Sequence, residues 1–495
     1  MNLWQGLEPS QLITLSILVP FIGSLLVLAT GKIPNLREGV TLTTAVILFS
    51  IVLAICDYTL DGVAMSLQVV ELFPGLSIAF DVEPLGVLFA LVASSLWIVT
   101  SIYAVGYMRG NNEGNQTRFF FCFALAISSV MAICFSGNLL TLFIFYEVLT
   151  LSTYPLVTHA GNDAAKQGGR TYLGILLTTS ICFLLFAILG TYSLTGTLDF
   201  QAGGIFDESH NKAILGILLV LFAFGIGKAA LMPFHRWLPA AMVAPTPVSA
   251  LLHAVAVVKA GVFSILKVAV YIFGIDELAD IPATDFVLYM AAATMVIASI
   301  IALTKDNLKA RLAYSTIAQL SYIILGAMLA TTAGAIGGAM HIASHAFGKI
   351  TLFFVAGAIY TTAHKKLVSE LDGIGKRMPL TMAAFTIGAL SMIGLPPAAG
   401  FISKWYLLLG ALDTAQWLAV IALILSTLLN AAYFIPIIYA AYFKPEEASD
   451  KHSEHGEAAL PILIPLLITA AMTVFIFFNH ELPLALAKQM LEVAP

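Results

Sequence analysis

Long apolar runs separated by short polar segments cover almost the whole chain, and this pattern predicts membrane-spanning helices. About 20 apolar residues, at a rise of 1.5 Å each, cross the hydrocarbon core of a bilayer. Fourteen such runs occur, and the predicted spans are 11–30, 38–56, 84–106, 118–135, 139–158, 171–193, 213–232, 247–273, 286–303, 313–330, 335–362, 380–410, 416–442 and 459–479. The chain is therefore predicted to be an all-α polytopic membrane protein, with residues 1–495 forming a single transmembrane domain.

Two segments outside the predicted spans have a different pattern. Residues 65–81 alternate apolar and polar side chains around Pro74-Gly75, which predicts a short external β-hairpin. Residues 445–457 form a polar loop that contains His452 and His455, and we interpret these two as solvated loop histidines rather than as metal ligands.

Composition supports the membrane interpretation. Hydrophobic residues make up 60% of the chain and charged residues only 10%, whereas a soluble domain carries about 25% charged residues. No basic patch interleaved with aromatics is present, so nucleic acid is not an expected partner. The four cysteines, Cys56, Cys122, Cys134 and Cys182, lack metal-ligand spacing and are expected to be buried apolar residues.

Lysine and arginine residues are divided unequally between the two sides of the predicted bundle. With fourteen spans, sixteen of them fall in loops on one side, whereas only Lys212 and Lys488 fall on the other. The positive-inside rule assigns the rich side to the cytoplasm. Both termini are therefore expected on the outer side of the membrane.

Several ionisable residues remain inside the predicted spans. They are Lys228, Lys259, Lys267, Lys349, Lys404, His253, His341, His345 and Glu147. A charge at mid-bilayer costs at least about 2.5–3.5 kcal/mol, so such residues face the protein interior and often mark a transport pathway. Packing or snorkelling could explain one lysine near a helix end, such as Lys267, but it does not account for the whole set.

His341, His345 and Lys349 recur at intervals of four residues and should share one helix face. An HxxxH pair can also bind zinc, but no glutamate follows the first histidine and no cysteine or aspartate lies nearby. Histidine titrates near neutral pH, so this ladder favours proton relay. His253 and Lys259 are expected on different faces of one span.

Two spans are predicted to be interrupted by proline, each beside a buried lysine. Pro233 and Pro239 follow Lys228, and Pro396-Pro397 precede Lys404. Proline kinks a helix, and broken helices at membrane depth are typical of transport sites.

The motifs resemble a known family of membrane proteins. They are Gly106-Tyr107-Met108, Arg118-Phe119-Phe120, Tyr146-Glu147, the stretches 228–235 (KAALMPFH) and 244–253 (APTPVSALLH), Leu312-Ala313-Tyr314-Ser315 and the His341–His345–Lys349 ladder. Together they look like the antiporter-like subunits shared by Mrp cation/proton antiporters, respiratory complex I and membrane-bound hydrogenases. The resemblance covers about residues 80–440 and implies about fourteen helices with two inverted repeats that contain broken helices.

The resemblance also implies roles for individual residues. Glu147 matches the key glutamate of the family and Lys228 its paired lysine, while Lys259 or His253 matches the central relay and Lys404 the terminal lysine. One departure is Tyr146, which stands where the family often has tryptophan.

The family resemblance suggests what the chain works with and what it moves. Its length resembles that of an Mrp D-type subunit, or of a relative in a membrane-bound hydrogenase, rather than the subunit with a long lateral helix. Other membrane subunits and the lipid bilayer are the expected partners, in a bacterial plasma (inner) membrane. No cofactor is expected, because no glycine fingerprint for a nucleotide follows a strand; protons, and Na⁺ in an antiporter, would be the transported ions.

Three functions remain open from the sequence: a proton-channel subunit of a Na⁺/proton antiporter, a pumping subunit of a redox-driven complex such as NADH-quinone oxidoreductase or hydrogenase, and a purely structural subunit. The buried ladder argues against the third. The first two share this type of subunit, and any redox chemistry would belong to partners.

Overall fold

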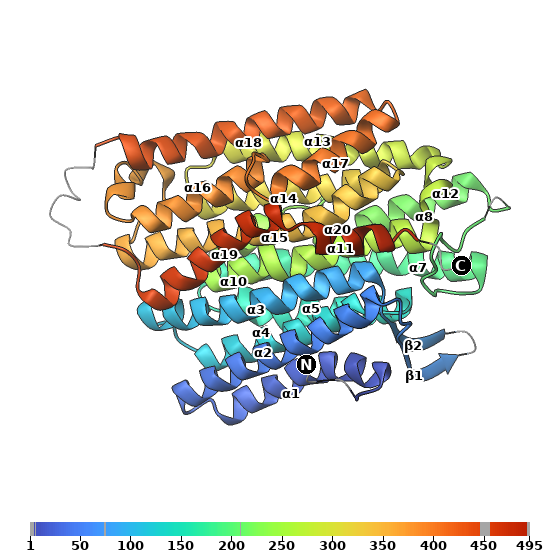
Figure 1. Ribbon diagram of the computed structural model, residues 1–495, viewed down its shortest axis with the longest axis horizontal. Helices are drawn as coiled ribbons and strands as arrows, with labels where there is room; N and C mark the ends of the chain where they lie inside the picture. Colours follow the sequence, from blue (N-terminus) through green and yellow to red (C-terminus); the bar gives the residue numbers. More distant parts are fainter. Residues whose placement is uncertain (1–3, 5, 74–75, 208, 446–455, 493–495) are drawn as a thin grey trace.

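A computed structural model describes residues 4, 6–73, 76–207, 209–445 and 456–492. Its helices run side by side between two ends of the molecule (Figure 1). Proline in the first turn starts α1, α2, α3, α13 and α16, where its missing N–H costs no hydrogen bond. Asparagine caps α5, α6 and α14 by accepting a hydrogen bond from a first-turn N–H group.

The first part of the chain comprises α1 (Pro9–Ala29), α2 (Pro34–Leu60), β1 (Ser66–Phe73), β2 (Leu76–Asp81), α3 (Pro84–Gly110), α4 (Gln116–Cys134), α5 (Leu139–Val157), α6 (Asp163–Thr179), the π-helix η1 (Ser180–Leu184) and α7 (Leu185–Thr195). The middle part comprises α8 (Lys212–Gly225), η2 (Gly227–Ala229), α9 (Trp237–Ala240), η3 (Ala241–Val243), α10 (Thr246–Ala250), η4 (Leu251–Val255), α11 (Val257–Val268), η5 (Ala269–Phe273) and α12 (Ile275–Ala279). The last part comprises α13 (Pro282–Thr304), α14 (Leu308–Met328), α15 (Thr332–Ala363), η6 (Val368–Glu370), η7 (Ile374–Lys376), α16 (Pro379–Ile393), α17 (Gly400–Asp413), α18 (Trp417–Phe443), α19 (Leu460–Phe478) and α20 (Glu481–Gln489).

The predicted all-α membrane architecture is confirmed. Among the described residues, 11 helices are long and apolar enough to cross a membrane. The other three predicted spans coincide with α8 and its continuation, with α14, and with the pair α16–α17. Two of these three are divided, as predicted, although the first break begins at Gly225, before Lys228 rather than after it.

Alternate loops gather at opposite ends of the bundle, as the span order requires. At one end, here called the basic pole, Arg118 donates to the His159 carbonyl at 2.9 Å and Lys444 pairs with Asp372 at 3.2 Å. The other end, here called the hairpin pole, carries β1, β2 and residues 196–207 and 209–211 (Figure 1). The end of α18 and the start of α19 lie at the basic pole (Figure 1). Residues 446–455, with His452 and His455, lie outside the described residues.

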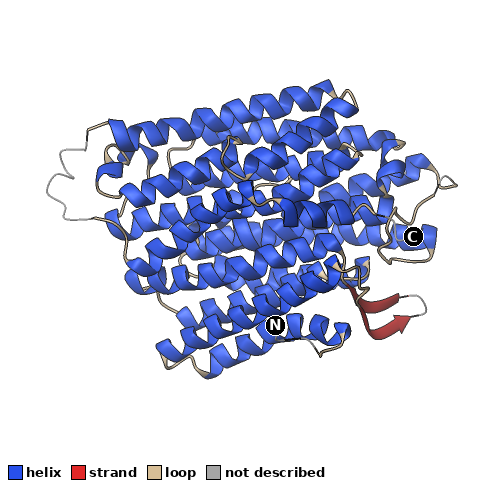
Figure 2. Cartoon of the chain, viewed as in Figure 1, coloured by secondary structure: helices blue, strands red, loops and turns tan. Residues whose placement is uncertain are grey.

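The predicted hairpin is confirmed and lies at one end of the bundle (Figure 2). Strands β1 and β2 pair in antiparallel fashion with Ser66 opposite Asp81; the turn residues Pro74 and Gly75 lie outside the described residues. Phe80 forms an isolated bridge with Ser136. The hairpin is therefore attached to the segment that joins α4 to α5.

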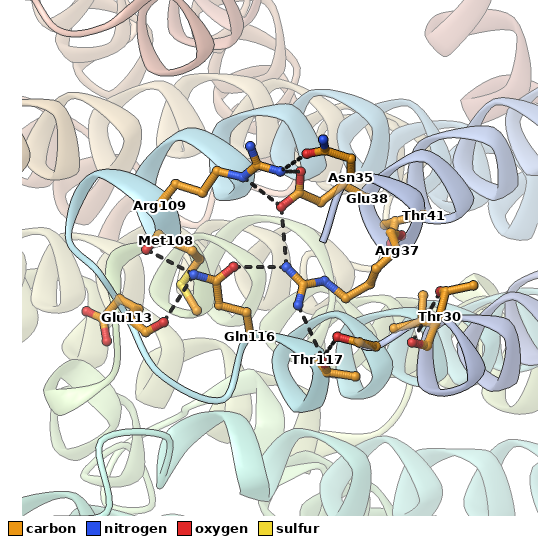
Figure 3. A network of polar contacts seen from close by, with 12 residues as sticks. Thr30, Asn35, Arg37, Glu38, Thr41, Met108, Arg109, Glu113, Gln116 and Thr117 are labelled. Carbon is orange, nitrogen blue, oxygen red and sulfur yellow. Dashed lines mark hydrogen bonds and ion pairs between the residues drawn. The ribbon is translucent and has the colours of Figure 1, made fainter. Parts of the chain in front are cut away.

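A charge network fastens α2, α3 and α4 together at the basic pole (Figure 3). The Glu38 carboxylate is bound by Arg37 at 3.3 Å and by two guanidinium nitrogens of Arg109. Arg37 also donates to Gln116 at 2.9 Å and to Thr117 at 3.2 Å. Because Arg37 and Glu38 are both buried, each needs the other to compensate its lost hydration.

Two spans lie at the centre of the bundle. The most apolar windows of Thr246–Phe273 and Thr332–Ala363 are buried along their whole length, whereas the other spans leave part of their surface exposed. Cys56, Cys122 and Cys134 are buried as expected, but the expectation for Cys182 is wrong, because it is exposed on η1. Its neighbour Ile181 is also exposed, so this part of η1 faces outward, where an apolar side chain suits a lipid environment.

Candidate proton relay

Lys228 lies in the break that follows α8, within the short 3-10 turn η2. Its side chain is completely buried. The ammonium donates to the Tyr146 carbonyl at 2.8 Å and to the Thr150 hydroxyl at 2.6 Å, and it lies 3.1 Å from the centre of the Tyr146 ring. Tyr146, the position at which the chain departs from its family, is thus the residue that holds Lys228.

Glu147 follows Tyr146 on α5, but it does not contact Lys228 directly. Among the described residues, no ion pair within 4 Å joins the two side chains, and both Glu147 carboxylate oxygens are buried without a hydrogen-bond partner. The pairing implied by the family resemblance is therefore not formed in this conformation. A buried carboxylate without a partner is costly, so an approach to the Lys228 ammonium would stabilise Glu147.

The backbone around Lys228 packs directly against α11. A Cβ atom at Gly261 would lie 2.3 Å from the Ala229 nitrogen and 2.4 Å from the Lys228 carbonyl carbon. Only glycine permits this approach. It brings the Lys228 turn next to the helix that carries Lys259, two residues before Gly261.

His253 and Lys259 occupy different helical segments of one span. His253 lies in the π-helix η4, which ends at Val255, and Lys259 lies in α11. Both nitrogens of the buried His253 ring lack a hydrogen-bond partner in the described part of the chain, and the ring packs 4.9 Å from that of Phe353. Short π-helical segments often occur at functional sites, and the sequence pattern did not reveal this one.

The closest contact within the ladder joins Lys259 to His345. The Lys259 ammonium and His345 Nδ1 are 2.6 Å apart, and both side chains are fully buried. An ammonium has only donors, so Nδ1 must accept and the ring proton of a neutral His345 resides on Nε2. The two residues can therefore exchange one proton directly.

His341 lies one turn before His345 on α15, with the two ring centres 5.9 Å apart. Its ring contacts the Ser403 hydroxyl at 2.8 Å and the Gln319 side-chain oxygen at 3.0 Å. The Gln319 amide nitrogen in turn donates to the Met392 carbonyl. Gln319 and Ser403 were not identified from the sequence, because single polar residues in apolar spans give no periodic signal.

Lys349, the third member of the ladder, points to a different set of partners. Its ammonium donates to the Ser315 hydroxyl at 2.8 Å, and Ser315 also accepts from Tyr433 at 2.9 Å. The Tyr433 hydroxyl is bound to the Asn430 side chain. The Leu312–Ser315 motif therefore supplies a ligand for this lysine.

Lys404 lies just after the second break, on α17. Its ammonium donates to the Met392 and Ile393 carbonyls at 2.8 and 3.0 Å, which the end of α16 leaves free. It also donates to the Tyr322 hydroxyl at 3.2 Å, and Tyr322 packs against His341 with ring centres 5.3 Å apart. A cavity of about 230 Å³ adjoins Lys404.

A second cavity, of about 320 Å³, opens at the basic pole. Its lining includes Lys309, Glu113 and Thr246. Burial raises the pKa of Glu113, an effect that Lys309 opposes. Thr246 begins the helical segment that leads to His253, so the cavity reaches from the basic pole toward the centre of the bundle.

The structure thus brings most of the predicted residues into two groups, whereas His253 and Lys349 contact Phe353 and Ser315 instead. Glu147 and Lys228 lie at the first break, whereas Lys259, His345, His341 and Lys404 follow one another through contacts along α11, α15 and α17. Among the described residues, no group of three or more His, Cys, Asp or Glu side chains is arranged to hold a metal ion.

The fold and this buried array define an antiporter-like membrane subunit. The family model "NADH:quinone oxidoreductase/Mrp antiporter, TM" matches residues 136–430. NADH-quinone oxidoreductase subunit N of Desulforudis audaxviator is 33% identical over 468 residues, which cover 91% of this chain and 92% of that one. The chain belongs to the NADH:quinone oxidoreductase/Mrp antiporter family of transmembrane subunits.

Other relatives come from both branches of the family. A Staphylococcus haemolyticus chain named as antiporter subunit mnhA2 is 30% identical over 426 residues, covering 81% of this chain and 52% of that one. The Mrp complex of Dietzia sp. contains a chain of the same fold, with a TM-score of 0.83, 23% identity and coverage of 98% and 97%. An archaeal membrane-bound sulfane sulfur reductase contains another, with a TM-score of 0.86, 24% identity and 98% coverage of both chains.

Proposed function

We propose that this chain is the proton-translocating membrane subunit of a multisubunit complex in a bacterial plasma membrane. The observation that supports this most strongly is the fully buried contact between Lys259 and His345, at 2.6 Å. Two titratable groups within hydrogen-bond distance, far from water, have no structural advantage over apolar side chains. Their chemistry suits the passage of a proton from one to the other.

The unpaired Glu147 supplies the switch in this proposal. If its carboxylate approaches to about 4 Å from Lys228, the attraction is about 4 kcal/mol at an effective dielectric constant of about 20. This exceeds the work of moving one charge against 100 mV, about 2.3 kcal/mol. Approach of Glu147 therefore favours protonated Lys228, and its withdrawal favours release of the proton toward His253 or Lys259.

From Lys259 the proposed path continues through His345 and His341 to Lys404. Lys349 lies on the same helix as the two histidines, and its ammonium is held by Ser315 beside this path. The cavity beside Glu113 and Lys309 offers a water-accessible start at the basic pole. Because His341 and His345 are separated by 5.9 Å between ring centres, transfer between them needs a bridging water or a side-chain rotation.

Two sources of energy are proposed for this path. In the first, the chain works with other membrane subunits of an Mrp-type antiporter that exchanges Na⁺ for protons, and relatives named as antiporter subunits support it. In the second, partners carry out a redox reaction that drives the pump. The near full-length match to a NADH-quinone oxidoreductase subunit specifically supports this second candidate.

The test uses the purified complex, reconstituted in sealed vesicles, with internal pH followed after Na⁺ is added in the absence of an electron donor. Proton movement that Glu147→Gln abolishes would support the Na⁺/proton antiporter. Proton movement that starts only when an electron donor is supplied, and that the same substitution abolishes, would support the redox pump.

A matched control carries Glu492→Gln, the same chemical change at an exposed position near the end of the described chain. It should transport protons like the unmodified complex. Transport that is equally normal in Glu147→Gln would refute the proposed relay in both of its forms.

A further inference from the structure

A second buried charge pair lies at the hairpin pole, outside the relay described above. Lys267 on α11 is fully buried and lies 3.0 Å from the carboxylate of Glu83, the residue that precedes α3. The Lys267 ammonium also donates to the Ser136 carbonyl at 2.7 Å and lies 4.3 Å from the centre of the Phe200 ring. Four segments that are distant in sequence therefore meet at one ammonium group.

The two side chains of the pair differ in their exposure to solvent. The Lys267 side chain is 0% exposed, whereas that of Glu83 is 13% exposed. Among the described residues, no other carboxylate lies within 4 Å of Lys267. Glu83 is therefore the carboxylate placed to exchange a proton directly with Lys267 and, through its partial exposure, with the water at the hairpin pole.

The other titratable groups around the pair make its charge adjustable. Asp81 on β2 and Tyr271 on η5 interact electrostatically with Glu83. Cys134 on α4 interacts in the same way with Lys267, and Asp199 with Asp81. The buried Tyr271 hydroxyl has no hydrogen-bond partner among the residues that the structure describes. Burial raises the pKa of Glu83, although Lys267 opposes this effect. Glu83 therefore accepts a proton more readily than a surface glutamate does.

We propose that Lys267 and Glu83 form a proton-exchange gate that connects the interior of the first half of the bundle with the water at the hairpin pole. In the exchange step the N–H bond of the ammonium breaks and an O–H bond forms on the carboxylate, which leaves a neutral amine beside a carboxylic acid. The acid then releases its proton to water, and the amine takes a new proton from the interior. The inference rests on the proposed proton translocation and adds a site of exit or uptake to it.

The position of Lys267 on the relay helix suits this role. Lys259 and Lys267 are eight residues apart on α11, or about 12 Å along its axis at a rise of 1.5 Å per residue. That separation excludes direct contact, so transfer between the two lysines requires intervening waters. The Ser136 carbonyl that binds Lys267 lies three residues before α5, the helix that carries Glu147. Lys267 is therefore connected to the helix of the proposed switch.

The gate is tested in vesicles that contain the reconstituted complex. The rate of proton transport is measured while the pH on the hairpin side is varied and the pH on the other side is held constant. Glu83→Gln should lower the rate about 100-fold, the scale of a lost proton-transfer group, and abolish its dependence on the hairpin-side pH. Glu83→Asp, which keeps the carboxylate, should restore transport with a shifted pH profile. Lys267→Met should resemble Glu83→Gln.

The matched control is Glu277→Gln, because Glu277 forms another ion pair at the same pole, with Lys212, and its side chain is 10% exposed. Its rate and pH profile should remain those of the unmodified complex. A Glu83→Gln complex with the normal rate and profile, or with a lower rate but the normal profile, would overturn the gate and leave a structural ion pair. Glu147→Gln is measured in parallel. If both the Glu83→Gln and the Glu147→Gln complexes transport protons normally, the proposed relay is refuted together with the gate. If only Glu147→Gln loses transport, the gate alone is refuted.

Discussion

Lys259→Met should abolish proton transport and yet leave the fold at least as stable as before. Methionine keeps the length of the unbranched stem and removes the charge. Lys259 is fully buried, and among the described residues its hydrogen-bond partner is the neutral His345 ring, with no carboxylate within 4 Å. An ion in the protein interior costs several kcal/mol of hydration, which only a well-placed opposite charge repays.

The magnitude follows from that imbalance. Replacing buried charges with apolar residues of similar volume is often neutral or stabilising by about 1–4 kcal/mol. From this we subtract about 1 kcal/mol for the hydrogen bond lost at His345. The expected change is therefore between about 0 and 3 kcal/mol in favour of the variant, together with transport reduced to the background of empty vesicles.

Lys267→Met provides the contrast, because the same substitution should have the opposite sign. Here the lysine has a carboxylate partner at 3.0 Å, and removal of one member of a buried pair leaves the other uncompensated, at a cost of about 3–5 kcal/mol. Partial exposure of Glu83 should reduce that cost to about 2–3 kcal/mol. The assay is thermal unfolding of the purified complex, followed by the loss of its monodisperse chromatographic peak, alongside vesicle transport. A Lys259→Met complex that unfolds at lower temperature while transporting protons normally would refute the reasoning.

Three further substitutions test individual contacts. Gly261→Ala should displace the Lys228 turn, because its Cβ would lie 2.3 Å from the Ala229 nitrogen, and lower both thermal stability and transport; Gly174→Ala, which has open space around it, should leave both unchanged. Tyr146→Phe removes the hydroxyl that accepts from the Lys228 N–H at 3.1 Å and should destabilise the fold by about 1 kcal/mol, measured by thermal unfolding. Glu38→Ala should cost about 3–5 kcal/mol, since it leaves buried arginine charge unpaired, but an assembled complex should keep its transport rate in vesicles.

Much of the architecture was accessible from the sequence because membrane constraints are strong. A membrane-spanning helix must satisfy its backbone hydrogen bonds within itself, so length and hydropathy locate the spans. The unequal distribution of lysine and arginine between alternate loops supports their number. The two breaks were found from proline, and the hairpin from its alternation. The orientation of the termini relative to the cell stays a prediction.

The interior was predicted less completely. Periodicity showed that His341, His345 and Lys349 share one helix, but not that His345 meets Lys259 while Lys349 meets Ser315. Such partners depend on how distant helices rotate against one another, which a single sequence does not record. The same limit applies to Cys182, whose apolar surroundings resemble those of a buried cysteine until the outward face of η1 is known.

Buried charges in this bundle either have an oppositely charged partner or lack one. Arg37 pairs with Glu38 at the basic pole, and Lys267 pairs with Glu83 at the hairpin pole, where the proposed exchange of a proton within the pair neutralises both groups. Along the central span Lys259 instead meets a neutral histidine, so the protein tolerates an uncompensated charge where a proton must be able to leave. A central path in which every lysine kept such a partner would hold its protons more firmly, because an attraction of about 4 kcal/mol would have to be broken at each step that carries a proton away from its pair.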